Sequence, residues 1–491
     1  MGAVVRHRAL LPSRIRGWLS LAAALAGGWA LAGAGSRAWE PSEIQAGASG
    51  LPSADGAAVT ATEWPSRPVG RLPELAVSGF NFANFMQVVG FERELGELRI
   101  RSIRFPAGNL GDQRDRTPAD LDLLRRHWLL LGRPQVVMQA RVFGGTPQQA
   151  VEAAHYAASI GLPIAYWEIG NEPDLYPPAG SWTPEGYCET FRAFADVLRP
   201  EAPQARFAGP AVSGGSHKME WVRRFVFACG DVVDVVTWHV YPTDGSWRED
   251  EALATSAEVS SEIELVRSWL RDPVTNPRGW RRAGEVGLGV TEFGLSWRSA
   301  SFRHLADFTA ALWTADVAGR LMAGRVELAQ YFALQDTGGH GLLDGAGFTR
   351  PTYYVFRMLS DFRGSVVPVR LNGARATVSA YAVAGDDGIL RVLVVNTDAS
   401  SAFRMHLEAA EGTGTRVLSA EQLTQTSLET YDDVVSLPAT LPALIAPRSV
   451  TVVRLGVTAR RDLRYEVGRR ARPLDACSEP TGELHLRLER L

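Results

Sequence analysis

The sequence predicts an α/β fold, a (β/α)8 TIM barrel, followed by a C-terminal β-sandwich domain. From residue 71 to 365, short apolar runs that suit buried parallel strands alternate with longer segments of helical period. Eight strands can be counted in this region, which has the length of a TIM barrel. After residue 365 apolar and polar residues alternate instead, as in a sandwich. An open doubly wound sheet is the alternative for the first region.

The candidate barrel strands are short apolar runs. They cover 75–82, 100–105, 135–140, 164–169, 205–208, 233–238, 287–291 and 327–332. Two helices between them have clear end signals, because Thr117-Pro118 and Thr146-Pro147 each place a capping residue before a proline. Both of these segments end at a glycine, as a helix C-terminus often does.

Residues 1–38 are predicted to be a cleaved signal peptide. Five arginines and no acidic residue precede Glu40, and the run from Trp18 to Ala34 is apolar or small. Ala32 and Ala34 have the spacing of a cleavage site, so we expect a secreted or extracytoplasmic protein. An N-terminal membrane anchor is the alternative. Residues 39–70, rich in Ser, Ala, Gly and Pro, are predicted to be a linker or a strand of the sandwich.

The sandwich is predicted to span 366–457, where three alternating segments are separated by turn residues. The tail, 458–491, holds eight arginines and six acidic residues with little apolar material. It is therefore predicted to be a poorly ordered or loosely docked extension.

The composition excludes several functions. With 51 basic and 54 acidic residues the net charge is −3, so no positive field would attract nucleic acid, and no stable membrane partner is expected. A hydrophobic content of 46% supports a large core. Three cysteines cannot form a disulfide framework; whether Cys188 and Cys229 pair is open, as is the oligomeric state.

Two strands of the predicted barrel are followed by a glutamate. The fourth runs into YWEIGNEPDLY, which contains Glu172, and the seventh into GLGVTEFG, which contains Glu292. The carboxyl ends of barrel strands meet on one rim. A facing pair of carboxylates is what cleavage of a glycosidic bond needs, one to protonate the leaving oxygen and one to meet the positive charge at the sugar carbon.

At these positions the chain resembles the clan A retaining glycoside hydrolases, over about 71–457. The resemblance implies that Glu172 is the acid/base, that Glu292 is the nucleophile, and that Asn171 binds the hydroxyl beside the reacting carbon. Arg104 in SIRFPAGN resembles the arginine that holds the nucleophile charged, and His239 and Tyr241 in VTWHVYP resemble groups around it.

The resemblance is weaker after the eighth strand, where the clan usually has a tryptophan and this chain has Tyr331 and Phe332. Glu168 is predicted to be a satisfied carboxylate inside the barrel mouth. Further polar residues follow strand ends and are candidate sugar contacts or merely solvated: Asn109, Asp112, Gln139, Arg141, His217, Gln335 and Asp336.

The expected mechanism is a double displacement. Partial burial and the negative field of Glu292 would keep Glu172 protonated, while Arg104 and Tyr241 would keep Glu292 ionised. The two carboxyl groups are predicted to lie about 5 to 5.5 Å apart. No metal or cofactor is expected, and the chain lacks both a P-loop and an H-E-x-x-H motif.

The predicted substrate is a glycoside, oligosaccharide or polysaccharide, with the sugar, the linkage and exo or endo action left open. Heparanase-like β-glucuronidases, arabinofuranosidases, β-xylosidases and certain endoglucanases all fit, and the segment RFPAGN favours the first two. A secreted carbohydrate-binding or scaffold protein without turnover is the alternative from another class. The paired glutamates argue against it, because binding alone requires no acid and nucleophile.

Overall fold

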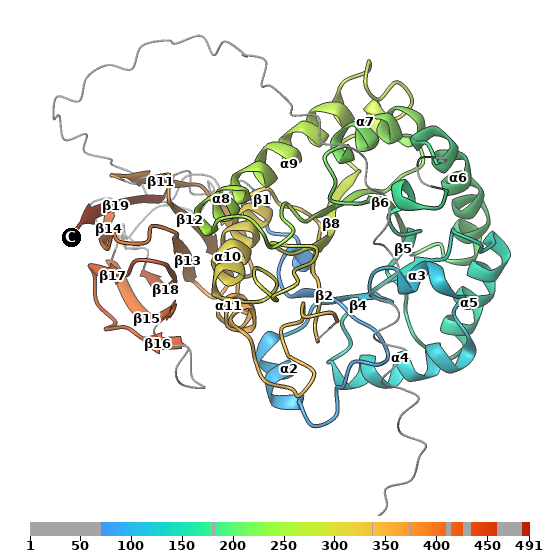
Figure 1. Ribbon diagram of the computed structural model, residues 1–491. Coiled ribbons are helices and arrows are strands. Elements are labelled where there is room, and N and C mark those ends of the chain that lie inside the picture. The colour runs from blue at the N-terminus through green and yellow to red at the C-terminus, as the bar shows by residue number, and fades with distance from the viewer. Residues whose placement is uncertain are drawn as a thin grey trace, which may run out of the picture. The chain divides into compact units, whose positions relative to one another are not determined.

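The computed structural model describes residues 70–491, except 179, 181, 336, 374–375, 409–413, 426–433 and 459–483. The predicted signal peptide therefore lies outside the described residues. Eight parallel strands, β2 to β9, close into a barrel in chain order, and β9 pairs with β2 to complete the ring (Figure 1). The predicted TIM barrel is confirmed and the open sheet is excluded. Among the described helices, none is long and apolar enough to span a membrane.

Each barrel strand falls on a predicted segment. The eight strands are β2 Gly79–Asn81, β3 Ser102–Phe105, β4 Gln135–Ala140, β5 Tyr166–Ile169, β6 Arg206–Val212, β7 Val235–Val240, β8 Gly287–Phe293 and β9 Leu328–Tyr331. The largest differences are at β2, which begins four residues after the predicted start at 75 because η1 occupies Glu74–Ala76, and at β6, which continues four residues past the predicted end at 208. Pro210 lies inside β6 opposite Thr237, the register with β7 shifts directly after it, and pairing resumes at Val212.

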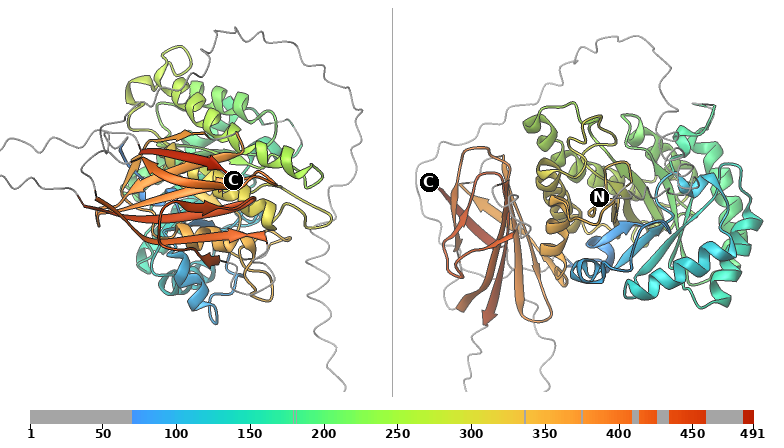
Figure 2. Two further views of the ribbon diagram at one scale, coloured as in Figure 1. Left: turned by 90° about the vertical axis from the view of Figure 1, so that its left-hand side faces the viewer. Right: turned by 60° about the horizontal axis from the view of Figure 1, so that its bottom comes forward.

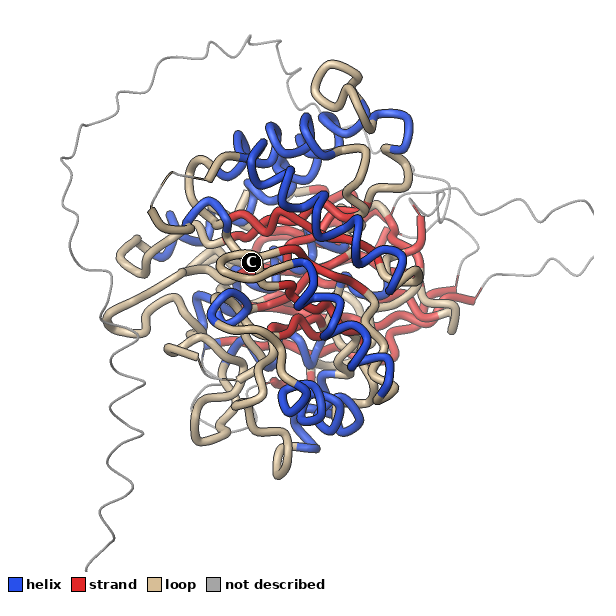
Figure 3. The backbone as a smooth tube through the Cα atoms, turned by 90° about the vertical axis from the view of Figure 1, so that its right-hand side faces the viewer, coloured by secondary structure: helices blue, strands red, loops and turns tan. Residues whose placement is uncertain are grey.

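Helices surround the barrel strands, as Figure 3 shows. The two Thr-Pro signals are confirmed: the Thr117 and Thr146 side chains cap α4 and α5, each in a reciprocal capping box with the residue three positions on. The helices are α2 Glu92–Leu98, α3 Leu110–Gln113, α4 Pro118–Leu130, α5 Pro147–Ser159, α6 Pro184–Glu201, α7 Lys218–Cys229, α8 Glu249–Ala254, α9 Ser256–Arg271, α10 Phe308–Ala323 and α11 Pro351–Leu359, with 3-10 turns η1 Glu74–Ala76, η2 Pro173–Leu175 and η3 Trp280–Arg282.

A disulfide joins two neighbouring helices of this layer. Cys188 on α6 is bonded to Cys229 on α7, which answers the question that the sequence left open. Both side chains are buried in the main core beside Phe191 and Phe225. Cys477 lies outside the described residues.

The C-terminal domain is a two-sheet sandwich, visible beside the barrel in Figure 2. Its core lies between the sheets and includes Val392, Val394 and Leu455. One sheet has the order β1 Gly70–Arg71, β10 Ser365–Val367, β12 Val378–Ala384, β13 Ile389–Asn396, β18 Ser449–Thr458, β15 Gly414–Thr424 and β16 Val434–Ser436; the other has β11 Val369–Asn372, β19 Leu484–Arg490, β14 Phe403–Glu408 and β17 Ala443–Ile445.

The predicted boundaries of the sandwich need two corrections. The tail is not a loose extension at 484–490, because β19 pairs with β11 on one side and β14 on the other. Leu484, Leu486 and Leu488 alternate into the sandwich core, a period of two that the surrounding charged residues obscured. At the other end, Gly70 and Arg71 pair with β10, so the segment 39–70 ends in a sandwich strand.

The sandwich packs on the barrel through α10, which contacts β12 and β13 and is buried on nearly all sides. Tyr381 on β12 donates a hydrogen bond to Asp316 on α10 at 2.6 Å. Gly319 allows this approach, because a Cβ at that position would lie 2.1 Å from the Tyr381 ring. Both candidate carboxylates come from the barrel, and neither comes from the sandwich.

Candidate active site

Glu172 follows β5 at a sharp turn in the backbone. Gly170 has φ +83°, and Glu172 itself has φ +48°, in the left-handed region that residues other than glycine rarely adopt. The turn is held because the Glu172 N–H donates to the Ala211 carbonyl at 2.9 Å and Pro173 begins η2 directly afterwards. Backbone strain of this kind is concentrated at functional sites.

Glu292 lies near the end of β8 and is 5% exposed. Its carboxylate accepts a hydrogen bond from the Arg104 guanidinium at 2.6 Å and one from the Tyr241 hydroxyl at 2.9 Å. Two donors, one of them a cation, thus hold this carboxylate in place at the end of β8.

Arg104 is completely buried at the end of β3 and organises the floor of the site. Besides Glu292, it bonds Glu168 at 2.5 Å, Asn171 Oδ1 at 2.7 Å and Asn81 Oδ1 at 2.9 Å. Burial opposes its charge, but the carboxylates of Glu168 and Glu292 outweigh burial and raise the pKa of Arg104. Glu168 thus lies inside the barrel, as predicted, but the carboxylate is only half satisfied, because its Oε1 is buried without a hydrogen-bond partner.

Glu172 is in a different electrostatic environment. Burial is the largest cause that raises its pKa, to about 8, and the negative charge of Asp174 is the next. Arg104 acts in the opposite direction, and Asp112 adds a smaller increase. We expected the field of Glu292 to supply the raising charge; the expectation is wrong in that detail, because Asp174, two residues along the chain, is the principal charged neighbour.

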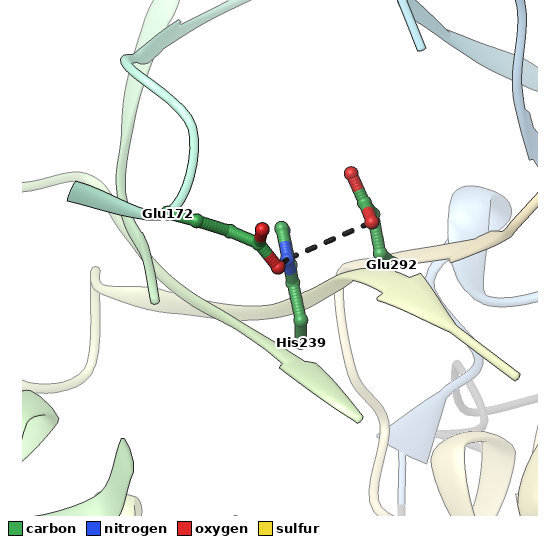
Figure 4. Close-up of side chains that lie close together, drawn as sticks. All are labelled: Glu172, His239 and Glu292. Carbon is green, nitrogen blue, oxygen red and sulfur yellow. Dashed lines mark hydrogen bonds and ion pairs between the residues drawn. The ribbon is translucent and has the colours of Figure 1, made fainter. Parts of the chain in front are cut away.

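His239 on β7 lies between the two glutamates (Figure 4). Its Nδ1 is 2.9 Å from Glu172 Oε1 and 3.7 Å from Glu292 Oε2, and its side chain is fully buried. Burial lowers the pKa of His239, which favours the neutral ring. The nearest oxygens of Glu172 and Glu292 are within 4.8 Å of one another, so the two carboxylates face each other across a short gap.

Glu172, His239 and Glu292 are also the described residues whose spacing could hold a metal ion, since one ligand atom from each lies within 4.8 Å of the others. We assign no metal to them. The Arg104 guanidinium already bonds Glu292 at 2.6 Å, and a second buried cation beside it would be repelled.

Asn171 connects the carboxylates to the neighbouring loops. Its side chain accepts from Arg104 and donates to Asn109 Oδ1 at 2.9 Å, so both predicted asparagines lie at the site. Asp112 is occupied differently: it accepts from the Tyr176 hydroxyl at 2.6 Å and from backbone N–H groups at 142, 143 and 171. Asp112 therefore braces the loops after β4 and β5.

The other predicted sugar contacts already have protein partners or are buried. Gln335 accepts from the Gln87 N–H at 2.5 Å, and Arg141 bonds Asp115 at 3.0 Å. Gln139 is 1% exposed beneath the loop after β3. His217 is half-exposed and bonds Asp174 at 2.7 Å. Asp336 lies outside the described residues.

Only one of the two aromatic residues at the end of β9 faces the site. Tyr331 is fully buried and packs against Phe293 and Phe356. The Phe332 ring lies 6.4 Å from that of Tyr241 and contacts His340. Phe332 is therefore the residue in the usual tryptophan position. Sequence reasoning missed His340, which lies in a long loop without any pattern, and Asp174, which stands inside the quoted motif.

Comparison with known proteins finds a match to a glycoside hydrolase family model. Residues 149–263 match the family model "Glycosyl hydrolase catalytic core". A β-xylosidase from Caldicellulosiruptor saccharolyticus is 22% identical over 244 residues, 46% of this chain and 47% of that protein, so the match spans about half of the relative.

Solved structures are similar over most of the described chain. A family 51 arabinofuranosidase from Xanthomonas axonopodis pv. citri superposes with a TM-score of 0.61 at 16% identity, covering 79% of this chain and 98% of the other. A monomeric β-xylosidase from Caulobacter crescentus CB15 gives 0.56 at 17% identity, covering 80% and 98%. At such identities the likeness shows the fold. Residues 149–263 thus match a glycosyl hydrolase catalytic core, and the chain has the fold of the solved arabinofuranosidase and β-xylosidase structures.

Proposed function

We propose that the protein is a secreted retaining glycoside hydrolase that cleaves O-glycosidic bonds by double displacement, with Glu172 as acid/base and Glu292 as nucleophile. One observation carries the proposal: two facing carboxylates have their nearest oxygens within 4.8 Å, and burial raises the pKa of one of them, Glu172, to about 8. A separation of roughly 6.5 to 9.5 Å would leave room for water and favour inversion. The shorter gap supports direct attack by Glu292.

In the first step Glu292 attacks the anomeric carbon while Glu172 gives its proton to the leaving oxygen. The bond from the sugar to the leaving group breaks as the bond to Glu292 forms. Because burial and Asp174 raise the pKa of Glu172 to about 8, it holds that proton at neutral pH. Arg104 and Tyr241 stabilise the charge of Glu292 before the attack.

In the second step Glu172, now a carboxylate, takes a proton from water. The water oxygen attacks the anomeric carbon and releases Glu292, so the sugar leaves with its original configuration. Neutral His239 touches both carboxylates through Nδ1, and it orients Glu172 without adding a charge that would lower the pKa of the acid.

The first substrates to test are α-L-arabinofuranosides and β-D-xylosides, since proteins of similar fold carry those activities in their names. β-D-Glucuronides belong in the same panel because of the RFPAGN segment. A binding or scaffold protein would have no use for Glu172, with its raised pKa, facing the second carboxylate of Glu292, and no described feature favours that alternative.

A panel of aryl glycosides tests the proposal. Wild-type protein should hydrolyse at least one member, and NMR of the first-formed sugar should show the configuration of the substrate. Glu172→Gln should lose far more activity on poor leaving groups than on activated ones. Glu152→Gln, an exposed residue on α5, is the matched control and should behave as wild type. An inverted product, or an active Glu292→Ala variant, would refute the mechanism.

A further inference from the structure

Exposed aromatic side chains gather on one arc of the barrel rim. Among the described residues of the barrel, most of the exposed aromatic rings lie in the loops after β2, β7, β8 and β9, four strands that are neighbours in the closed barrel. The loops after β3 to β6 contain no exposed aromatic ring in the described part of the chain. The arc consists of Phe85, Trp247, Trp297, Phe302 and Phe348, which are 43 to 64% exposed.

This aromatic arc is continuous with the candidate active site. The loops after β7 and β8 are joined at Thr243, whose N–H donates to the Leu295 carbonyl at 3.2 Å and whose carbonyl accepts from Trp297 N–H at 3.1 Å. The first residue after β7 is Tyr241, which bonds the nucleophile. Trp297 therefore belongs to a hydrogen-bonded pair of loops that directly follow the strands carrying His239 and Glu292.

Phe302 is the most exposed aromatic ring of the arc. Its φ is +59°, a left-handed conformation that is unfavourable for a bulky residue, and its side chain is 64% exposed. The ring lies over Gly339 in the loop after β9, where an added Cβ would be 2.4 Å from it. Large aromatic rings left exposed together are typical of an interaction site.

The charges of the arc indicate what kind of ligand it takes. The four loops hold Arg248, Arg298, Arg303 and Arg350 against Asp244, Asp307, Asp336 and Asp344, so they have no net charge. An acidic ligand would favour an excess of positive side chains. Exposed aromatic rings suit a ligand with flat apolar faces and polar edges, and the rings of an uncharged sugar have both.

We propose that the aromatic arc binds an uncharged glycan chain that extends beyond the sugar held between Glu172 and Glu292. The natural substrate is then a neutral oligosaccharide or polysaccharide, and an acidic one such as a glucuronide polymer is excluded. This inference rests on the proposed function. Arg298 lies 4.2 Å from the centre of the Trp297 ring and covers one face of it, so the sugar stacks on the other face.

The test compares substrates of two sizes in matched variants. Trp297→Ala and Phe302→Ala should lower kcat/KM for a neutral polysaccharide at least tenfold, as about 1.4 kcal/mol of lost stacking implies, and change it less than twofold for a small aryl glycoside. Trp280→Ala and Phe227→Ala are the controls, since both rings are exposed but lie in η3 and α7, away from the arc. Equal losses on both substrates, or equal losses in the controls, would overturn the inference.

A binding measurement separates this inference from the proposed function. Glu292→Gln should be retarded in native gels that contain arabinoxylan, xyloglucan or arabinan, and retardation should disappear when Trp297→Ala and Phe302→Ala are added. Heparin should not retard it, and stronger retardation by heparin would overturn the inference. Retardation that depends on Trp297 and Phe302, with no hydrolysis of any glycoside by wild type, would support the aromatic arc as a binding site and refute the enzymatic proposal. Hydrolysis that does not depend on either aromatic residue would support the enzymatic proposal and refute the binding site.

Discussion

The pKa of Glu172 predicts the alkaline limb of the pH profile. With a pKa of about 8, roughly 90% of the acid is protonated at pH 7 and roughly 10% at pH 9, so kcat/KM should fall about tenfold between them. An ordinary glutamate, with a pKa near 4.5, would be less than about 1% protonated at pH 7. The structure therefore predicts activity at neutral pH that an unperturbed carboxyl group could not supply.

Asp174→Asn is the variant that tests the cause. The substitution removes the negative charge that raises the pKa of Glu172 most, but it leaves Glu172 buried, and burial is the larger cause of the raised pKa. A neighbouring charge moves a pKa by about 1 to 3 units, and the alkaline limb should move to lower pH by about one unit. At pH 8 the protonated fraction would then fall from about one half to about one tenth, a loss of about fivefold.

The assay is kcat/KM for an aryl glycoside with a poor leaving group, measured from pH 5 to 10, because that parameter reports ionisations of the free enzyme. Asp196→Asn on α6, an exposed aspartate, is the control and should leave the limb in place. An unmoved limb in Asp174→Asn, or the same shift in both variants, would refute the electrostatic account of Glu172.

Three further predictions concern stability and the nucleophile. Between pH 4.5 and 8 the folded state binds the Glu172 proton more tightly than the unfolded state, so the free energy of unfolding of wild type falls as pH rises. Glu172→Gln should remove this loss, which amounts to up to about 5 kcal/mol. The variant should therefore unfold at a higher denaturant concentration than wild type at pH 8. Equal midpoints at pH 8 would contradict it. Tyr241→Phe removes one hydrogen bond to the Glu292 carboxylate, worth about 1.5 to 3 kcal/mol, so kcat/KM should drop by about 10- to 150-fold with little change in melting temperature; a loss below twofold would show that the bond is dispensable. Truncation after residue 365 would expose the face of α10 that packs against β12 and β13 and should abolish soluble expression, whereas a soluble and active barrel would show that the sandwich is dispensable.

The barrel and its carboxylate pair could be predicted because both depend on local patterns. A parallel strand shows itself as an apolar run, and the residue after its carboxyl end is placed on the rim by the fold alone. Glu172 and Glu292 follow from that rule, whereas Arg104 is predicted from the resemblance of the segment SIRFPAGN. The structure brings them together, with Asn171, His239 and Tyr241, in one hydrogen-bonded cluster.

The features that sequence reasoning missed depend on contacts between distant segments. The pairing of Cys188 with Cys229 requires that α6 and α7 be adjacent, which spacing along the chain does not reveal. The choice between Tyr331 and Phe332 depends on a one-residue difference in where β9 ends and the loop turns inward. The effect of Asp174 on Glu172 arises from burial and from the turn at η2, and neither has a sequence signature.

The position of β19 gives the last residues of the chain an importance that their distance from the site does not suggest. β19 is an inner strand of its sheet, and residues 459–483 separate it in sequence from β18, its predecessor along the chain. Loss of 484–491 would leave β11 and β14 with unpaired edges. It would also remove Leu484, Leu486 and Leu488 from the sandwich core and expose the side chains that pack against them. The same arrangement makes a synthetic 484–491 peptide a donor strand for a shortened chain, so that restored folding would report peptide capture.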